Sequence, residues 1–391
     1  MVSAATGGIY HCRLVTKRAT PSRLSIVVET TPLAPLPGVL PLSYYAARIG
    51  DDWSGFGVST EPGAAMRTAR CEALERFGVS HPEFANPQWR GAPPLLTDWE
   101  GLTFDYLRAV APHVSHAKPS RLDYRLARAL DGNRVLGLLP LPWIYLNASP
   151  ATNTNGTAFG ATLASAQMAA RHEVIERDML LRSWYGSAAS RELTAKERRR
   201  SSVEYWQRQA TAVGLRARWF LLGPERASLK SVVCVIGADK PPHWGSGSAT
   251  RPDLESAAHK AFLEAAGSHL GHVAAATRLG VRRFVKAALN RATRAPSTFR
   301  RSAFEAYWAS RGREGLDEIA GRFSRPRTGD TRQLSDRDFL WVDVTPAGVP
   351  KGRVVKVFHP DAVPLPNTMK DVRLIERLLG VPPDTAPPPI S

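Results

Sequence analysis

Alternation of apolar and polar residues, bounded by proline and glycine signals, marks five stretches of the chain as strands. Strands of this kind are typical of an antiparallel or mixed sheet that helices cover on one side. The predicted strands are RLSIVVET (23–30), RVLGLLPLPWIYL (134–146), SVVCVIGA (231–238), DFLWVDVT (338–345) and GRVVKVFHP (352–360).

A first helix is expected after the segment STEPG. Ser59 or Thr60 is a suitable N-cap, because its side-chain oxygen can accept a hydrogen bond from a free backbone N–H of the first turn. Pro62 fits the first turn, where no N–H is needed, and Gly78 is a suitable end. The sequence therefore predicts a helix that begins near Pro62 and ends near Gly78.

Three further helices are expected along the chain. The second follows the loop NGTAFGAT and continues to about Ser183, and the third begins near TRPDLE, with Thr250 as its cap and Pro252 in its first turn. An amphipathic helix is expected at 367–380. Strands and helices are intermixed without strict βαβ alternation, which predicts the α+β class.

The composition indicates a folded protein without a membrane span. Of its 391 residues 43% are apolar and 8% aromatic, which is enough for one large domain or two ordinary ones. No run of about 18 apolar residues and no secretory signal occur, so we expect a cytoplasmic protein. Three distant cysteines, Cys12, Cys71 and Cys234, argue against a disulfide framework or a structural zinc site.

Positive charge exceeds negative charge strongly. The chain has 52 Lys and Arg against 35 Asp and Glu, a formal net charge of +17, which favours a polyanionic or phosphate-bearing partner. Apart from clusters at 196–202 and 278–294 the charge is scattered, and no aromatic-interleaved basic patch accompanies it. We therefore expect a solvated Arg-rich surface, with a nucleic-acid-binding face as the alternative.

Two segments, ARCEALER and ARHEVIER, share the pattern ARxExxER. A spacing of three residues places Glu72 beside Glu75, and Glu173 beside Glu176, on one face of a helix. Like charges at this spacing repel each other, and a buried carboxylate is costly unless it is paired. If these faces are buried, a positive charge is expected between the acids.

The positive charge between the acids could come from two sources. A third interpretation requires no such charge. Arg76 and Arg177 could form a structural ion-pair network with the acids. Mg²⁺ is the other source, because it prefers oxygen ligands and bridges carboxylates to nucleotide phosphates. Each copy could also be an exposed amphipathic helix. HEVIE lacks the second histidine of the HExxH zinc helix, and ExxE is not the ExxH of di-iron bundles.

Two more segments fit a nucleotide site. In the third helix KAFLEAAGSH places Glu264 on an Ala-rich face that reads as buried and leaves the acid unpaired. Ahead of the second helix, Thr154, Asn155 and Gly156 offer a hydroxyl, an amide and open backbone, which suit phosphate or ribose. No P-loop and no GxGxxG is present, and the lone Gly55–Gly57 GxG is weak evidence. A nucleotide site here must be of another type.

These segments resemble the motifs of the YcaO family, ATP-dependent enzymes that activate the peptide backbone. TNGTAFGATLASAQMAARHEVIERD is similar to SNGxAxGxxxxEAxxxAxxExxERD, ARCEALER to SxxEAxER, and KAFLEAAGSH to RAxxEAxQxR. The resemblance covers roughly residues 40–391. It implies an α+β fold of mixed or antiparallel sheets and packed helices around an ATP site that is neither P-loop nor Rossmann. It also implies an extension at 1–40, a catalytic domain at 41–380 and a Pro-rich tail at 381–391.

The resemblance also implies the cofactors, ATP and Mg²⁺, and the residues that bind them. The implied ligands of the metal are Glu72, Glu75, Glu173, Glu176 and Glu264. The implied nucleotide contacts are Thr154, Asn155, Arg177 and Lys260. In the implied reaction a Cys, Ser or Thr side chain of a precursor peptide attacks the preceding carbonyl, and phosphorylation of the oxyanion lets the oxygen leave as phosphate. The product is a thiazoline or oxazoline, and the protein mainly positions groups and neutralises charge.

The tail and the third motif depart from the family pattern. Azoline-forming members end in PxPxP, whose terminal carboxylate reaches the active site. Here PPPIS ends the chain, so Ser391 takes that catalytic place, and the tail favours azoline formation over thioamide or amidine formation. In the third motif Lys260 replaces Arg, Gly267 replaces Gln and His269 replaces Arg. These changes leave a catalytically impaired scaffold in the same type of complex as an alternative.

Partners follow from the same resemblance. Because only about forty residues precede the catalytic part, we expect a separate ThiF-like or ocin-ThiF-like protein that binds the leader of a ribosomal precursor peptide. The basic charge suits an acidic leader. A homodimer stays open, no membrane is expected, and the sequence does not identify the precursor.

Overall fold

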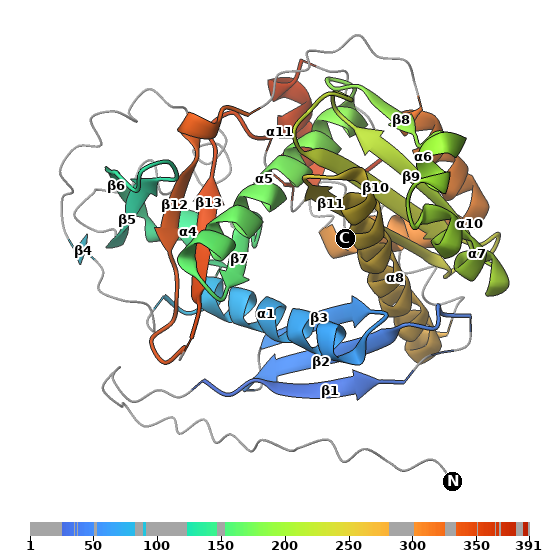
Figure 1. The fold of residues 1–391 in the computed structure, drawn as a ribbon, viewed down its shortest axis with the longest axis horizontal. Helices are drawn as coiled ribbons and strands as arrows, with labels where there is room; N and C mark the ends of the chain where they lie inside the picture. Colours follow the sequence, from blue (N-terminus) through green and yellow to red (C-terminus); the bar gives the residue numbers. More distant parts are fainter. Residues whose placement is uncertain are drawn as a thin grey trace.

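Three antiparallel sheets and the helices packed on them make up the fold (Figure 1). The computed structural model describes residues 26–34, 36, 38–50, 53–82, 89–90, 123–146, 153–280, 301–324, 334–349, 351–363, 365–366, 369–380 and 386–389. The α+β class with antiparallel sheets is the one expected from the sequence.

The first sheet has the order β1-β2-β3 and carries α1 on one face. Its strands are β1 (Glu29–Leu33), β2 (Ser43–Ile49) and β3 (Trp53–Ser59), and the helix is α1 (Pro62–Ser80). The strand expected at 23–30 therefore begins later than predicted, and residues 23–25 lie outside the described part. Because β1 pairs with β2, residues 29–33 of the expected extension belong to this sheet.

The second sheet has the order β11-β10-β9-β8 and lies between two layers of helices. Its strands are β8 (Ser190–Glu192), β9 (Arg216–Leu222), β10 (Lys230–Gly237) and β11 (Trp244–Arg251). One layer holds α7 (Val203–Ala212) and α8 (Leu254–Leu279), and the other holds α5 (Leu163–Tyr185) and α10 (Arg301–Phe323). The short α6 (Ala195–Arg199) precedes α7.

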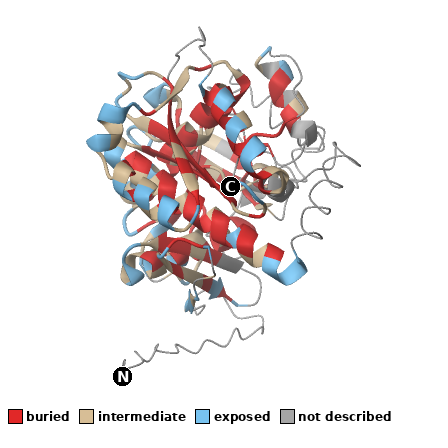
Figure 2. Cartoon of the chain, turned by 90° about the vertical axis from the view of Figure 1, so that its right-hand side faces the viewer, coloured by how far each residue is buried: buried red, intermediate tan, exposed pale blue. Residues whose placement is uncertain are grey.

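The sequence of strand β10 is a continuous apolar run because both faces of the strand are buried. Val233 and Val235 face α5 and α10, whereas Val232, Cys234 and Ile236 face α7 and α8. A strand buried on both faces needs no polar alternation. Figure 2 shows the same pattern, with buried residues along the inner strands and on the helix faces that cover them. Among the described residues no helix is both long and apolar enough to cross a bilayer.

The third sheet has the order β4-β5-β12-β13-β7, and β6 pairs with β5. Its strands are β4 (Trp89–Arg90), β5 (Asp123–Ala129), β6 (Val135–Pro140), β7 (Thr157–Gly160), β12 (Leu340–Asp343) and β13 (Arg353–Phe358). The strand predicted at 134–146 ends at Pro140, and the helical turn α4 (Leu141–Ile144) with a proline in its first turn follows. The amphipathic helix expected at 367–380 is α11 (Met369–Leu378).

The first helix begins at Pro62, as expected, but two predicted N-caps and one predicted helix end are wrong. The N-cap of α1 is Glu61, without a side-chain cap bond, and neither Ser59 nor Thr60 caps the helix. Gly78 lies inside α1, where a Cβ would be 3.0 Å from a methyl of Val354, so it serves close packing and the helix continues to Ser80. The start of α8 differs because β11 continues to Arg251. Its N-cap is therefore Asp253, which accepts from Ser256 N–H at 2.8 Å, and not Thr250.

The contact between β3 and α1 depends on glycines. A Cβ on Gly55 would lie 2.0 Å from Ala69 O, and a Cβ on Gly57 would lie 1.9 Å from Ala65 O. No side chain fits at such separations, so backbone packs directly on backbone. We call this contact the β3–α1 glycine seam. It gives the GxG motif, uninformative in the sequence, a structural role.

A second seam of the same kind joins β11 to α8. A Cβ on Gly245 would lie 2.2 Å from Ala265 O, and one on Gly247 would lie 2.4 Å from Ala261 O. We call it the β11–α8 glycine seam. The Ala-rich composition of α8 follows from it, because larger residues on this face would separate helix and strand.

Candidate functional site

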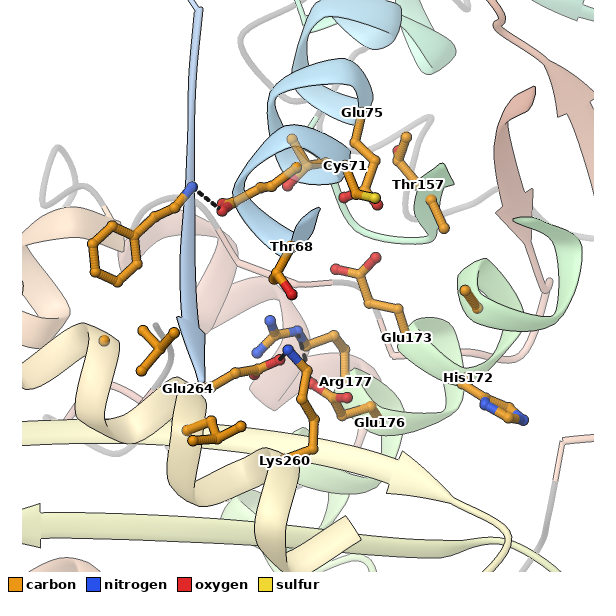
Figure 3. Close-up of a pocket in the computed structure, with 18 of the residues that line it drawn as sticks. Thr68, Cys71, Glu75, Thr157, His172, Glu173, Glu176, Arg177, Lys260 and Glu264 are labelled. Atoms are coloured by element: carbon orange, nitrogen blue, oxygen red, sulfur yellow. Dashed lines mark hydrogen bonds and ion pairs between the residues drawn. The ribbon is translucent and has the colours of Figure 1, made fainter. Parts of the chain in front are cut away.

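A cavity of about 710 Å³ lies between α1, α5 and α8 (Figure 3). Of the ten residues that the sequence singles out, eight line it, namely Glu72, Glu75, Thr154, Glu173, Glu176, Arg177, Lys260 and Glu264. Asn155 is not among the lining residues, and Ser391 lies outside the described part of the chain. Acids that are far apart in the sequence therefore face one space.

The acids of α1 are held by the backbone of two different sheets. Phe56 N–H donates to Glu72 Oε2 at 2.5 Å, and Phe159 N–H donates to Glu75 Oε1 at 2.9 Å. Glu72 also pairs with Arg76. Burial raises the pKa of Glu75 to about 8, and the nearby Glu173 and Glu72 add to the rise. Glu75 is thus a fixed carboxyl that lacks sufficient positive charge.

Glu176 of α5 is in the same situation. Ser248 of β11 donates its hydroxyl to Glu176 Oε1 at 2.7 Å, and Arg177 Nε lies 3.7 Å from the same oxygen. Burial raises the pKa of Glu176 to about 8, and Glu264 and Glu173 contribute, although Arg177 acts in the opposite direction. Arg177 therefore offsets the effect of burial on Glu176 only in part, and the pKa of this carboxyl stays raised.

Glu264 differs from the expectation. Its side chain is 31% exposed, and its Oε1 lies 3.2 Å from Lys260 Nζ, so the acid is neither buried nor unpaired. The Cβ of Glu264 borders the β11–α8 glycine seam, 2.5 Å from where a Cβ on Gly247 would lie, but the carboxylate extends from there to the cavity. Lys260 and Glu264 stand at the cavity as an ion pair on one helix.

The other departures of the third motif have separate positions. Gly267 lines the cavity beside Phe56. His269 is fully buried, and its Nε2 lies 3.1 Å from His243 Nδ1. His269 is therefore a core residue, and its difference from the motif's arginine does not leave a gap in the lining.

Buried histidines predict a loss of stability in acid. Burial lowers the pKa of His269 to about 3 and that of His272 to about 4. Unfolded histidines take up protons below a pH of about 6.5, so the stabilisation is complete above that pH and is lost as the pH falls. From about pH 7 to about pH 5 we expect the free energy of unfolding of the unaltered chain to fall by about 1–2 kcal/mol relative to that of His269→Gln.

Urea unfolding at the two pH values measures this difference. Comparison of the two proteins is needed because the raised pKa values of Glu75 and Glu176 change stability in the opposite direction. An identical pH dependence in both would show that His269 titrates normally.

The loop that contains Thr154 and Asn155 is positioned by Lys356 and Asn153, which are not among the predicted site residues. Lys356 of β13 donates its amine to Asn153 O, and Asn153 Oδ1 accepts from Asn155 N–H at 3.0 Å. Burial lowers the pKa of Lys356 to about 7, although Glu173 opposes this. The only sequence signal is a lysine within the apolar strand VVKVF. The Asn155 amide oxygen is buried with no partner among the described residues, and its contact with a nucleotide stays a prediction.

The donor set fits a magnesium nucleotide. Thr157 lines the cavity with a buried hydroxyl that has no hydrogen-bond partner in the described structure. Within the described residues no three acidic, His or Cys side chains already form a metal-binding group. Mg²⁺ commonly takes one or two carboxylates and completes its shell with phosphate oxygens and water. Separate carboxylates around a large cavity suit that mode.

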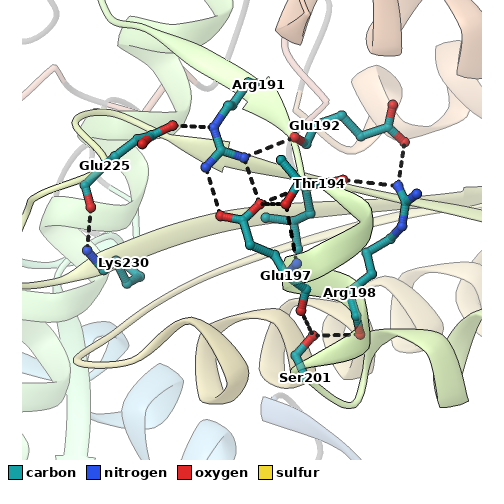
Figure 4. Close-up of polar contacts among 9 residues, drawn as sticks. Arg191, Glu192, Thr194, Glu197, Arg198, Ser201, Glu225 and Lys230 are labelled. Carbon is teal, nitrogen blue, oxygen red and sulfur yellow. Dashed lines mark hydrogen bonds and ion pairs between the residues drawn. The ribbon is translucent and has the colours of Figure 1, made fainter.

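The basic cluster at 196–202 contributes partly to an ion-pair network (Figure 4). Arg191 pairs with Glu197 at 2.8 Å and with Glu225 at 2.5 Å. Arg218 pairs with Glu192 at 2.7 Å. Arg198 lies 3.9 Å from the same Glu192. These contacts support the solvated Arg-rich surface. The second cluster, at 278–294, lies mostly outside the described residues.

Comparisons with known proteins agree with this geometry. The family described as YcaO cyclodehydratase, ATP- and Mg²⁺-binding, matches residues 55–362. No curated protein matches the chain significantly. The chain resembles the solved structure of a heterocyclase in complex with substrate and cofactor, with 15% identity and a TM-score of 0.59, over 86% of this chain and 50% of that one. It thus spans half the length of that protein.

Two further structures match over most of both chains. YcaO from Methanopyrus kandleri bound with AMPPCP and Mg²⁺ has 17% identity and a TM-score of 0.56, over 93% of this chain and 91% of that one. The E. coli microcin synthetase McbBCD complex has 15% identity and a TM-score of 0.57, over 85% and 88%. At these identities the likeness shows the fold, and the family match covers most of the chain. The chain therefore belongs to the YcaO family of ATP- and Mg²⁺-binding cyclodehydratases.

Proposed function

We propose that the chain is an ATP- and Mg²⁺-dependent cyclodehydratase subunit that converts Cys, Ser or Thr residues of a ribosomal precursor peptide to thiazolines or oxazolines. The cavity walled by glutamates from three helices carries this proposal. Membership of the YcaO family supplies the reaction class.

The residues proposed for the site have two roles, metal binding and nucleotide contact. Glu72, Glu75, Glu173, Glu176 and Glu264 would hold Mg²⁺, and Arg177, Lys260, Thr154 and Asn155 would contact the nucleotide. When bound, ATP supplies the phosphoryl group that converts the amide oxygen of the peptide into a leaving group. Arg177 and Lys260 would neutralise phosphate charge. The glutamates that accept hydrogen bonds from the protein would hold the metal and the phosphates in place. The peptide loses one water, and ATP becomes ADP and phosphate.

The tail and the partners complete the proposal. Trp308 Nε1 donates to Pro387 O at 3.0 Å, and Ala386 to Pro389 are buried, so the described end of the tail is packed in the core instead of being loose. We assign a catalytic carboxylate to Ser391 on the resemblance alone. Solved YcaO-fold relatives include a microcin synthetase complex with pro-MccB17 bound, which supports a peptide substrate and a leader-binding partner.

Reconstitution tests the reaction. The full chain, its precursor, the leader-binding partner and Mg²⁺-ATP are incubated, and the peptide is weighed by mass spectrometry. We expect the loss of one water mass per ring, with ADP formed in parallel and no product without Mg²⁺. Sulfur incorporation would instead indicate a thioamide-forming member, and water loss through attack by a backbone amine would indicate an amidine-forming one. ATP binding without any peptide change overturns the proposal.

A scaffold without catalysis is the second candidate, because the third motif is altered. The structure gives its altered positions other roles, since Gly267 accommodates Phe56 and His269 lies in the core. A scaffold would bind the partner but not Mg²⁺-ATP, and calorimetry on the full chain separates the two.

A further inference from the structure

The cavity lining contains apolar residues beside the acids, namely Phe56, Val58, Leu263 and Gly267. A nucleotide combines a charged triphosphate with a flat, weakly polar base, so its site needs both kinds of lining. The role proposed here for Phe56 rests on the proposed nucleotide site.

Phe56 and Gly267 fit each other closely. A Cβ on Gly267 would lie 2.8 Å from Phe56 Cε1, 3.3 Å from its Cδ1 and 3.1 Å from Val58 Cγ2. Any side chain at 267 would therefore displace the ring. The third motif of the family has glutamine where this chain has Gly267, so the ring of Phe56 fills space next to a missing side chain.

The ring of Phe56 is held at a fixed position relative to the acids. Its backbone N–H donates to Glu72 Oε2 at 2.5 Å, and the flanking Gly55 and Gly57 press β3 onto α1. Tyr44 supports the ring from the core at a centroid separation of 6.2 Å. Phe56 is half-buried, so part of it faces the cavity.

We propose that the adenine base of ATP stacks on the ring of Phe56. Gly267, which has no side chain, leaves the space that this ring needs. Aromatic stacking recognises the face of a base and tolerates any base, whereas an amide at 267 would read its edge. Phe56 and Gly267 would therefore determine how the base is recognised. The base would be bound by stacking, where the family pattern has a polar side chain.

Calorimetry with two ligands tests this assignment on the full chain. Mg²⁺-ATP carries the base, and Mg²⁺-tripolyphosphate lacks it. We expect Phe56→Ala to bind ATP about 10- to 100-fold more weakly and tripolyphosphate as the unaltered chain does. Phe56→Trp should retain ATP binding. Equal weakening for both ligands would mean that Phe56 acts through Glu72, and no weakening would mean that the base lies elsewhere; either overturns the proposal.

The reciprocal variant gives an independent readout. Gly267→Gln should displace the ring, lowering the melting temperature and ATP affinity, and the double variant Phe56→Ala/Gly267→Gln should melt higher than Gly267→Gln alone. Additive effects would contradict the contact. If the unaltered chain binds neither ligand, the nucleotide site itself fails, and this is distinguishable from selective loss in Phe56→Ala.

Discussion

Glu176→Gln is expected to lower Mg²⁺-dependent turnover by at least about 100-fold while the chain stays folded. The amide keeps an acceptor for the Ser248 hydroxyl, which donates at 2.7 Å, but it cannot ionise to meet a metal ion. Magnesium then loses a carboxylate ligand. The folded chain without ligand should be at least as stable as before, because a buried neutral amide costs less than a buried carboxylate.

Phosphate release and thermal melting measure the two effects together. Mg²⁺-ATP should raise the melting temperature of the unaltered chain and have little effect on the variant. Glu314→Gln is a suitable control, since Glu314 is exposed on α10 and does not line the cavity. If Glu176→Gln retains turnover, the proposed ligand set is wrong. If it unfolds, the acid serves the fold through Arg177 and Ser248.

Gly57→Ala should destabilise the chain by about 3 kcal/mol, the upper end for overpacking. Its added methyl would lie 1.9 Å from Ala65 O and 2.6 Å from Ala69 N, both backbone atoms of α1. The helix must therefore move away from β3 and carry Glu72 and Glu75 with it. We expect weaker Mg²⁺-ATP binding in addition to the shift of the urea unfolding midpoint.

Gly63→Ala in the first turns of α1 is the matched control. Among the described residues its methyl would meet only the flexible end of Arg67, at 3.4 Å. Alanine also has a higher helix propensity than glycine, so this variant should be neutral or slightly stabilised. Equal stability of the two variants would disprove the β3–α1 glycine seam as a stabilising contact.

Sequence reasoning identified the acids because their signal is local. A spacing of three on a helix fixes a common face, so Glu72 with Glu75, and Glu173 with Glu176, could be paired without a structure. The motifs then identified the family and its fold. Helix caps failed where β11 ran on past Thr250, because a strand's end depends on its neighbour and not on its own residues.

Other parts of the site depend on contacts between distant segments. Phe56 meets Gly267, and Lys356 holds the loop at Asn153. The lysine within VVKVF is unusual in the sequence, but nothing local indicates the partner in either pair. Burial of Glu264 was overestimated because an Ala-rich helix indicates close packing without showing which face packs. Such pairs become visible only when the sheets and helices are placed together.

Direct backbone contact in the β3–α1 and β11–α8 glycine seams makes these joints stiff spacers. Side-chain layers can slip or repack, whereas peptide groups in van der Waals contact hardly compress. Main-chain geometry therefore sets the distance of α1 from β3 and of α8 from β11. These two distances do not depend on the solvent-exposed side chains of α1 and α8. Exposed residues on the two helices could therefore be replaced to improve solubility while each helix stays at the same distance from its strand.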